Sequence, residues 1–111
     1  MGEMKERYEE SLSLLEKLES MTPKKIEAWY GFAESLKEGV LSEKISLLIA
    51  LALATVKGCE ACIIHYTRAV IEAGATKEEI LEACWIAVKM DGGPGLANLG
   101  FVLKVIEEFA E

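Results

Sequence analysis

Two cysteines three positions apart, Cys59 and Cys62, are the residues of this chain best suited to chemistry, and His65 and Tyr66 follow them. On a helix, side chains at i and i+3 share a face, so two sulfurs in the first turn are close enough to bridge with little backbone movement. Amide N–H groups and the positive end of the helix dipole stabilise a thiolate there, which is the nucleophile of disulfide exchange and of attack on a peroxide. The spacing therefore indicates a redox-active pair.

Two other interpretations of the cysteine pair stay open: the cysteines bind a metal, or they are inert. A zinc site built on Cys59, Cys62 and His65 needs a fourth ligand or an open position for water. The remaining cysteine, Cys84, stands among apolar residues and is expected to be buried and structural. Haem attachment is excluded, because it requires a histidine directly after the second cysteine and Ile63 stands there.

The elements that must position the pair are helices. Apolar residues recur at helical spacing along the chain and no stretch alternates with a period of two, which predicts an all-α fold of about six helices. We expect one domain over residues 1–111, with N-terminal helices over 3–38 and a core that bears the cysteine pair over 41–110. Caps, glycines and prolines place the helices near residues 3–20, 23–38, 43–57, 59–73, 77–90 and, after a break over 91–95, up to 109.

The helix over 43–57 is apolar on every side beyond its first turn. Such a helix lies at the centre of a fold or in a subunit interface. Because a short chain of six helices has more apolar surface than one small core can hide, we expect a homo-oligomer. The alternative is a compact monomer with this helix as its axis. Aromatic residues at core spacing are expected to pack inside the protein, namely Trp29, Trp85, Phe101 and Phe109.

Charge and composition exclude several classes of protein. With 12 basic and 19 acidic residues the formal net charge is −7 and the cations form no stripe, whereas nucleic acids and anionic membranes bind clustered cations. A chain that is 51% hydrophobic is too apolar for intrinsic disorder. Its charged start is unlike a signal peptide and its longest apolar run, 45–56, is too short to span a membrane, so we expect a cytoplasmic protein. Charged residues are mostly Glu and Lys and Gln is absent, which is typical of thermophiles.

Three segments of the chain resemble the alkylhydroperoxidase D-like, or carboxymuconolactone decarboxylase, family over roughly residues 41–100. They are the stretch 48–52 with the following 58–62, the segment 72–80, and the turn 92–94. The resemblance implies an all-α homotrimer or homohexamer that acts as a thiol-dependent oxidoreductase, either a peroxidase or a disulfide exchanger. It also implies that Cys62 attacks a small hydroperoxide or disulfide substrate, that Cys59 resolves the product, and that a dithiol or protein reductant restores the pair without flavin, haem or metal.

The sequence departs from the family at two positions. Redox members carry a Glu and a His that relay protons to the cysteines, and counting along that motif places Leu47 and Tyr66 there instead. Peroxidase turnover loses a general acid and base by this change. Two nearby residues are candidates to substitute in part: His65, three positions after Cys62, and Glu43, one helical turn before Leu47.

Two alternatives to a thiol enzyme remain. The first is a non-catalytic helical oligomer in which a bond between Cys59 and Cys62 is structural or redox-sensing. The second is lactone decarboxylation, the activity of other members of the family that the sequence resembles. A dicarboxylate substrate needs a basic pocket, and only Lys57 and Arg68 lie near the motif.

Overall fold

The computed structural model describes residues 2–110, and Met1 and Glu111, the two ends of the expected single domain, lie outside the described residues. Over 2–110 the chain is all-α, as predicted, with six α-helices, one 3-10 turn and no strand. Their bounds are α1 Glu3–Met21, α2 Pro23–Ser35, η1 Leu36–Glu38, α3 Glu43–Lys57, α4 Glu60–Glu72, α5 Lys77–Asp91 and α6 Gly93–Phe109. None of these helices is long and apolar enough to cross a membrane.

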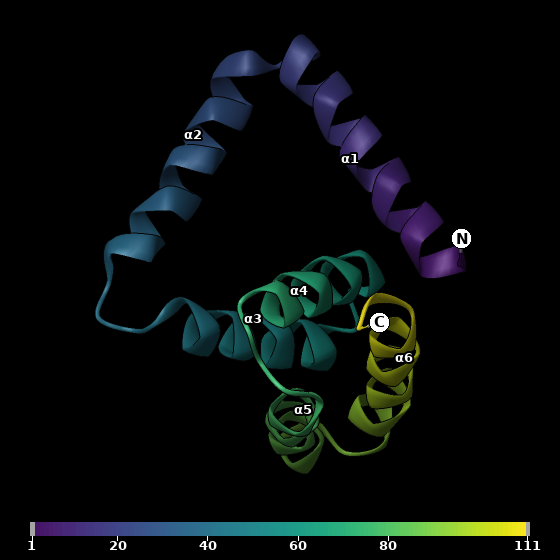
Figure 1. Ribbon diagram of the computed structural model, residues 1–111. Helices are drawn as coiled ribbons and strands as arrows, with labels where there is room; N and C mark the ends of the chain where they lie inside the picture. The colour runs from purple at the N-terminus through teal and green to yellow at the C-terminus, as the bar shows by residue number, and fades with distance from the viewer. Residues whose placement is uncertain (1, 111) are drawn as a thin grey trace.

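Helices α3, α4, α5 and α6 form a cluster, and α1 and α2 extend from it as an open V (Figure 1). The buried side chains of the cluster make one apolar core, which α1 joins only through its first turns. The members of that core are Met4, Leu51, Ala54, Ile63, Ile64, Val70, Ile80, Cys84, Leu99, Val102, Val105 and Ile106. The cysteine pair therefore opens a helix, α4, that lies inside the best-packed part of the chain.

The start of α1 is fastened to the end of α6. Met4 is fully buried, and the backbone N–H groups of Met4 and Lys5 donate hydrogen bonds of 3.1–3.2 Å to the carboxylate of Glu108. A helix leaves its first N–H groups unpaired and carries partial positive charge there, so a carboxylate is a favourable partner. This contact anchors one end of α1 and leaves its far end to project.

Residues 12–38, which we call the arm, are mostly exposed. Helix α2 has no buried residue, and Trp29 and Phe32 are 61% and 60% exposed. The large apolar side chains that the arm exposes are Leu12, Leu14, Leu15, Leu18, Met21, Trp29, Tyr30, Phe32 and Leu36. Helix α1 is thus the expected half-exposed cover only over its first turns, and the arm presents an apolar surface to solvent.

Helix α3 has the bounds that the sequence predicts, but only one of its faces is covered. Leu51, Ala54 and Thr55 are buried, whereas Ile45, Ile49, Leu53 and Val56 are 40–59% exposed. The single chain is therefore not a compact bundle with α3 as its axis. Its second apolar face is open, like the apolar face of the arm.

The tryptophans contradict the expected core. Trp29 and Trp85 are 61% and 53% exposed, and only Phe101 and Phe109 pack against the core as expected. Helical periodicity shows that a side chain belongs to an apolar face, but it does not show which element, or which chain, covers that face.

The loop between α5 and α6 is shorter than the sequence predicts. The expected break over 91–95 reduces to Gly92, whose φ of +81° ends α5, while Pro94 already lies in the first turn of α6. Proline is tolerated in a first turn because its missing N–H has no intrahelical partner there.

We expect Thr76→Ala to lower the free energy of unfolding by about 1 kcal/mol, because it removes the cap of α5. The Thr76 hydroxyl accepts from Glu79 N and the Glu79 carboxylate accepts from Thr76 N, at 3.1 and 2.8 Å. Chemical denaturation followed by circular dichroism measures the change. Thr22→Ala is the matched control, because Thr22 opens α2 without such a cap. An equal loss in the two variants would contradict the assignment.

Candidate functional site

The candidate site is built on the tight turn between α3 and α4. Gly58 ends α3 in the left-handed conformation, with φ at +67°, which only glycine adopts at little cost. The next backbone N–H, that of Cys59, donates back to the Ala54 carbonyl oxygen over 3.3 Å. Cys59 is also the N-cap residue of α4, so only two residues, Gly58 and Cys59, separate the two helices.

The structure brings the two predicted cysteines together. Cys59 and Cys62 form a disulfide with Cα atoms 5.2 Å apart, and the Cys62 N–H donates to the Cys59 sulfur over 3.3 Å. Both residues are partly buried. The arrangement places one sulfur at the position where the helix start stabilises negative charge, and it places the second sulfur one turn further along α4.

His65 and Tyr66 lie next to each other on α4, with their rings in an edge-to-face contact of 4.9 Å between centroids. Partial burial of the ring first, and the positive charge of Arg68 second, lower the pKa of His65 below its ordinary value of 6.5, although the residue as a whole is exposed. His65 is therefore neutral at pH 7. Within residues 2–110 no hydrogen bond joins it to either sulfur while the disulfide is formed, and the approach of His65 to the pair stays a prediction.

The positions where the family carries its proton relay are apolar or packed in this chain. Leu47 and Tyr66 are both partly buried and pack against the core, as Cys62 does. Glu43 is exposed in the first turn of α3, at the opposite end of that helix from the turn that bears the pair. At the two relay positions this chain therefore has side chains that pack against the core, instead of a carboxylate and an imidazole.

The structure places a cation, Arg7, near the cysteine pair, which the sequence did not predict. Arg7, from α1, donates to the Glu60 carboxylate over 3.1 Å, and its guanidinium lies 5.4 Å from the centre of the Phe101 ring. Glu60 stands between the two cysteines in the sequence. Both charged side chains are substantially exposed, so this ion pair adds little stability and mainly fixes α1 beside the motif.

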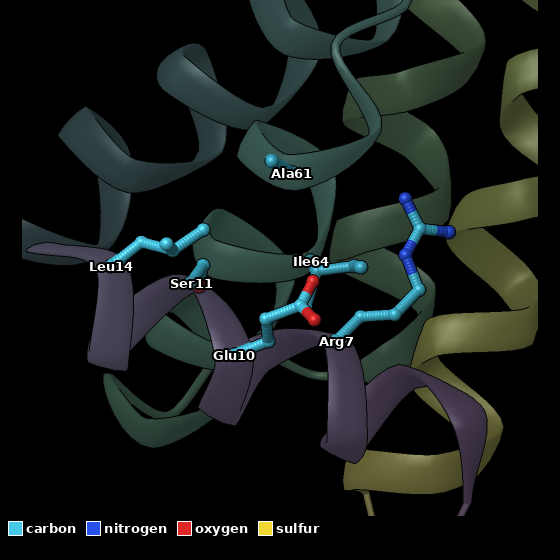
Figure 2. A pocket seen from close by; sticks show the side chains of 6 residues that line it. All are labelled: Arg7, Glu10, Ser11, Leu14, Ala61 and Ile64. Atoms are coloured by element: carbon cyan, nitrogen blue, oxygen red, sulfur yellow. The ribbon is translucent and has the colours of Figure 1, made fainter.

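A pocket of about 180 Å³ lies beside this ion pair, between α1 and α4. Figure 2 shows its lining, which comprises Arg7, Glu10, Ser11, Leu14, Ala61 and Ile64. Ala61 belongs to the motif, but on an ideal helix it points about 100° away from Cys62. The pocket is therefore a neighbour of the pair, on a different face of α4.

Metal binding was the second interpretation of the cysteines. Among the described residues, no group of three or more His, Cys, Asp or Glu side chains is arranged to hold a metal ion. Cys84 is fully buried, as predicted, and lies 3.7 Å from the Thr55 hydroxyl. Burial raises the pKa of the Cys84 thiol, which leaves Cys59 and Cys62 as the accessible sulfurs.

Comparison with known proteins shows the family and the fold of the chain. The sequence model of the carboxymuconolactone decarboxylase family matches residues 23–104. The chain belongs to this family. A protein encoded in the cox locus of Paracoccus denitrificans is 37% identical over 71 residues, and the match spans 64% of each chain. A protein of Cupriavidus necator is 35% identical over 74 residues, which is 66% of each chain.

Two crystal structures of this family have the same fold. A Legionella pneumophila member, solved in its apo form, superposes with a TM-score of 0.94 at 32% identity over 97% of both chains. A Thermotoga maritima member superposes with a TM-score of 0.82 at 25% identity, over 93% of this chain and 89% of its own. Because these matches cover nearly the whole chain, the projecting arm is part of the shared architecture.

We expect the pKa of His65 to lie below 6.5, measured from the NMR titration of the one histidine in the chain. Just below pH 6.5, His65 is protonated in the unfolded chain but still neutral in the folded chain. The free energy of unfolding therefore falls as the pH falls through this window. Arg68→Gln raises the pKa but leaves it below 6.5, because burial is the larger cause. Arg7→Gln is the control and leaves it unchanged. A titration at or above 6.5 would show that the ring is not desolvated.

Proposed function

We propose that this family member is a thiol-disulfide oxidoreductase in which Cys59 and Cys62 alternate between dithiol and disulfide. The observation that carries the proposal is the disulfide at the start of α4, where the Cys62 N–H points at the Cys59 sulfur. A thiolate on Cys59 is stabilised by that N–H and by the helix dipole. Cys59 is therefore a good leaving group when a reductant opens the bond at Cys62.

The reaction balances without a bound cofactor. With a hydroperoxide, the Cys62 thiolate attacks the distal oxygen, the O–O bond breaks, and the alcohol leaves with a proton while Cys62 becomes a sulfenic acid. The Cys59 thiol then attacks the Cys62 sulfur, which forms the disulfide and releases water. An external dithiol returns two electrons and two protons to the pair. Assignment of the attacking role to Cys62 follows the family's order.

Disulfide exchange is the better supported of the two oxidoreductase activities. It needs a thiolate and an accessible disulfide, both of which the start of α4 supplies. Peroxide reduction also benefits from a general acid for the leaving oxygen, and Leu47 and Tyr66 occupy the family's relay positions. The neutral imidazole of His65 accepts a proton and does not supply one, so His65 is a candidate base for the Cys62 thiol and not a replacement for the acid. The Thermotoga maritima relative, named as a candidate for an antioxidative role, supports hydroperoxides as a second substrate class.

Lactone decarboxylation is less well supported. A dicarboxylate substrate needs two unpaired cations, yet Arg7 pairs with Glu60 over 3.1 Å and Arg68 with Glu72 over 2.9 Å. Of the cations named near the pair, Lys57 alone makes no ion pair among the described residues. The thiol function requires a compartment in which a dithiol or protein reductant keeps the pair cycling. We therefore place the protein in the cytoplasm, where such reductants are present.

We also propose that the protein acts as a homotrimer or homohexamer. The chain exposes 7433 Å², whereas a compact monomer of 12.2 kDa exposes about 6,000 Å². Its radius of gyration is 14.4 Å, against about 13 Å for a compact chain of this length. The surplus surface is the apolar side of the arm and the open face of α3. A second copy of the chain, which carries the same two surfaces, is the partner that covers them.

We expect Cys59→Ser and Cys62→Ser each to abolish turnover of a small disulfide and of a hydroperoxide with a dithiol reductant, because each removes one half of the cycle. Cys84→Ala is the matched control and retains turnover, since its thiol is buried away from the pair. His65→Ala slows both reactions, because it removes the candidate base for the Cys62 thiol. A wild type without turnover, combined with a lower melting temperature in both serine variants, would indicate a structural or redox-sensing disulfide instead.

We expect sedimentation equilibrium to give a mass of three or six chains for the wild type. Trp29→Glu combined with Phe32→Glu lowers that mass, because both side chains are on the exposed apolar side of the arm and a buried carboxylate is costly. Lys25→Glu, also in α2, is the control for a charge change that removes no apolar side chain. A monomeric wild type would contradict the proposed assembly.

A further inference from the structure

Asn98, on α6, reaches across to the turn that carries the cysteine pair. Its Nδ2 group donates to the backbone oxygen of Thr55 over 2.8 Å, and the two residues are 43 positions apart in the sequence. Asn98 is partly buried and is the one asparagine of the chain. No relay or nucleophile role in the proposed mechanism uses it.

Asn98 binds the backbone oxygen of Thr55, at the end of α3, where carbonyl groups lack hydrogen-bond partners within the helix. The last carbonyl groups of a helix have no partner in the next turn, and Thr55 is in the last turn of α3. Gly58 N–H also donates to this oxygen, but over the longer distance of 3.3 Å. The Asn98 bond is therefore the shorter of these two bonds to the Thr55 oxygen.

Asn98 touches the glycine of the same turn as well. A methyl group placed on Gly58 would lie 3.2 Å from the Asn98 Nδ2 atom, which is tighter than ordinary van der Waals contact. The amide therefore lies close to Gly58 while it binds the Thr55 oxygen. The residue that follows Gly58 is Cys59, whose own N–H is tied to Ala54 over 3.3 Å.

We propose that Asn98 is a positioning residue that holds Cys59 in bridging geometry when the cysteine pair is reduced, and thereby favours the disulfide over the dithiol. This inference rests on the proposed thiol-disulfide function. In the oxidised state the covalent bond itself restrains Cys59. In the reduced state that restraint is gone, and the Asn98 bond limits how far the turn opens, so it raises the effective concentration of one thiol at the other.

A purely structural role for Asn98 makes a different prediction. Asn98 has buried apolar neighbours on α6, among them Leu99 and Val102, and the bond would then only help these residues to hold α6 against the cluster. Its loss would lower the melting temperature and leave the ratio of disulfide to dithiol unchanged. The redox equilibrium, and not the stability, separates the two roles.

The test is the equilibrium constant for disulfide formation in wild type, Asn98→Ala and Asn98→Asp, measured by thiol labelling in dithiothreitol redox buffers. Asn98→Asp keeps the size of the side chain and removes the donor, so it serves if Asn98→Ala folds poorly. We expect the constant to fall by about three- to tenfold in both variants, the effect of losing one hydrogen bond from the favoured geometry. Thr76→Ala, which weakens α5 far along the chain from the pair, is the control for lost stability and leaves the constant unchanged.

Two results would overturn the inference, and they are distinguishable. If the wild type equilibrates reversibly and both Asn98 variants stay within about twofold of it, Asn98 has no positioning role although the proposed function stands. If the wild-type pair does not equilibrate with dithiothreitol at all, the proposed function fails, and the inference fails with it.

Discussion

The left-handed turn at Gly58 is the constraint on which the site depends. Gly58 ends α3, and the next residue, Cys59, is already the N-cap of α4. That double position ties Cys59 to Ala54 on one side and points the Cys62 N–H at its sulfur on the other. A longer loop would leave the same two cysteines in the sequence and lose the fixed distance between them.

Around this turn the side chains mainly hold the two cysteines in place, and few of them can donate or accept protons. Leu47, Tyr66 and Cys62 all pack against the apolar core, while the charged residues nearby, Arg7 and Glu60, neutralise each other. A pair in such surroundings is governed by how well its two sulfurs are held and by access to a reductant. Peroxide reduction needs a proton for the leaving oxygen, and Leu47 and Tyr66 stand in place of the family's relay there. The residues at these two positions therefore favour a disulfide over a hydroperoxide as the proposed substrate.

Local signals in the sequence predicted most of the fold. Ser42, Thr76 and Gly58 each mark a helix boundary through contacts within a few residues, and apolar periodicity identified every helix. The partners of Arg7 and Asn98 lie 53 and 43 residues away, and such contacts leave no local pattern that a reading of one sequence can detect. The exposure of Trp29 was equally unpredictable from the sequence, because an apolar helix face has the same pattern whether the same chain or another chain covers it.

The placement of the tryptophans has a consequence for how this protein is observed. The chain has two tryptophans, and both Trp29 and Trp85 are on its surface, one on the arm and one on α5. Their fluorescence therefore reports on what covers the surface, not on whether the core is intact. In the proposed oligomer, dilution that separates the copies would shift the emission while the helices persist, and loss of helix in a separated chain would change it less. If the proposed oligomer forms, an optical signal usually taken as a measure of unfolding becomes a measure of contact between copies.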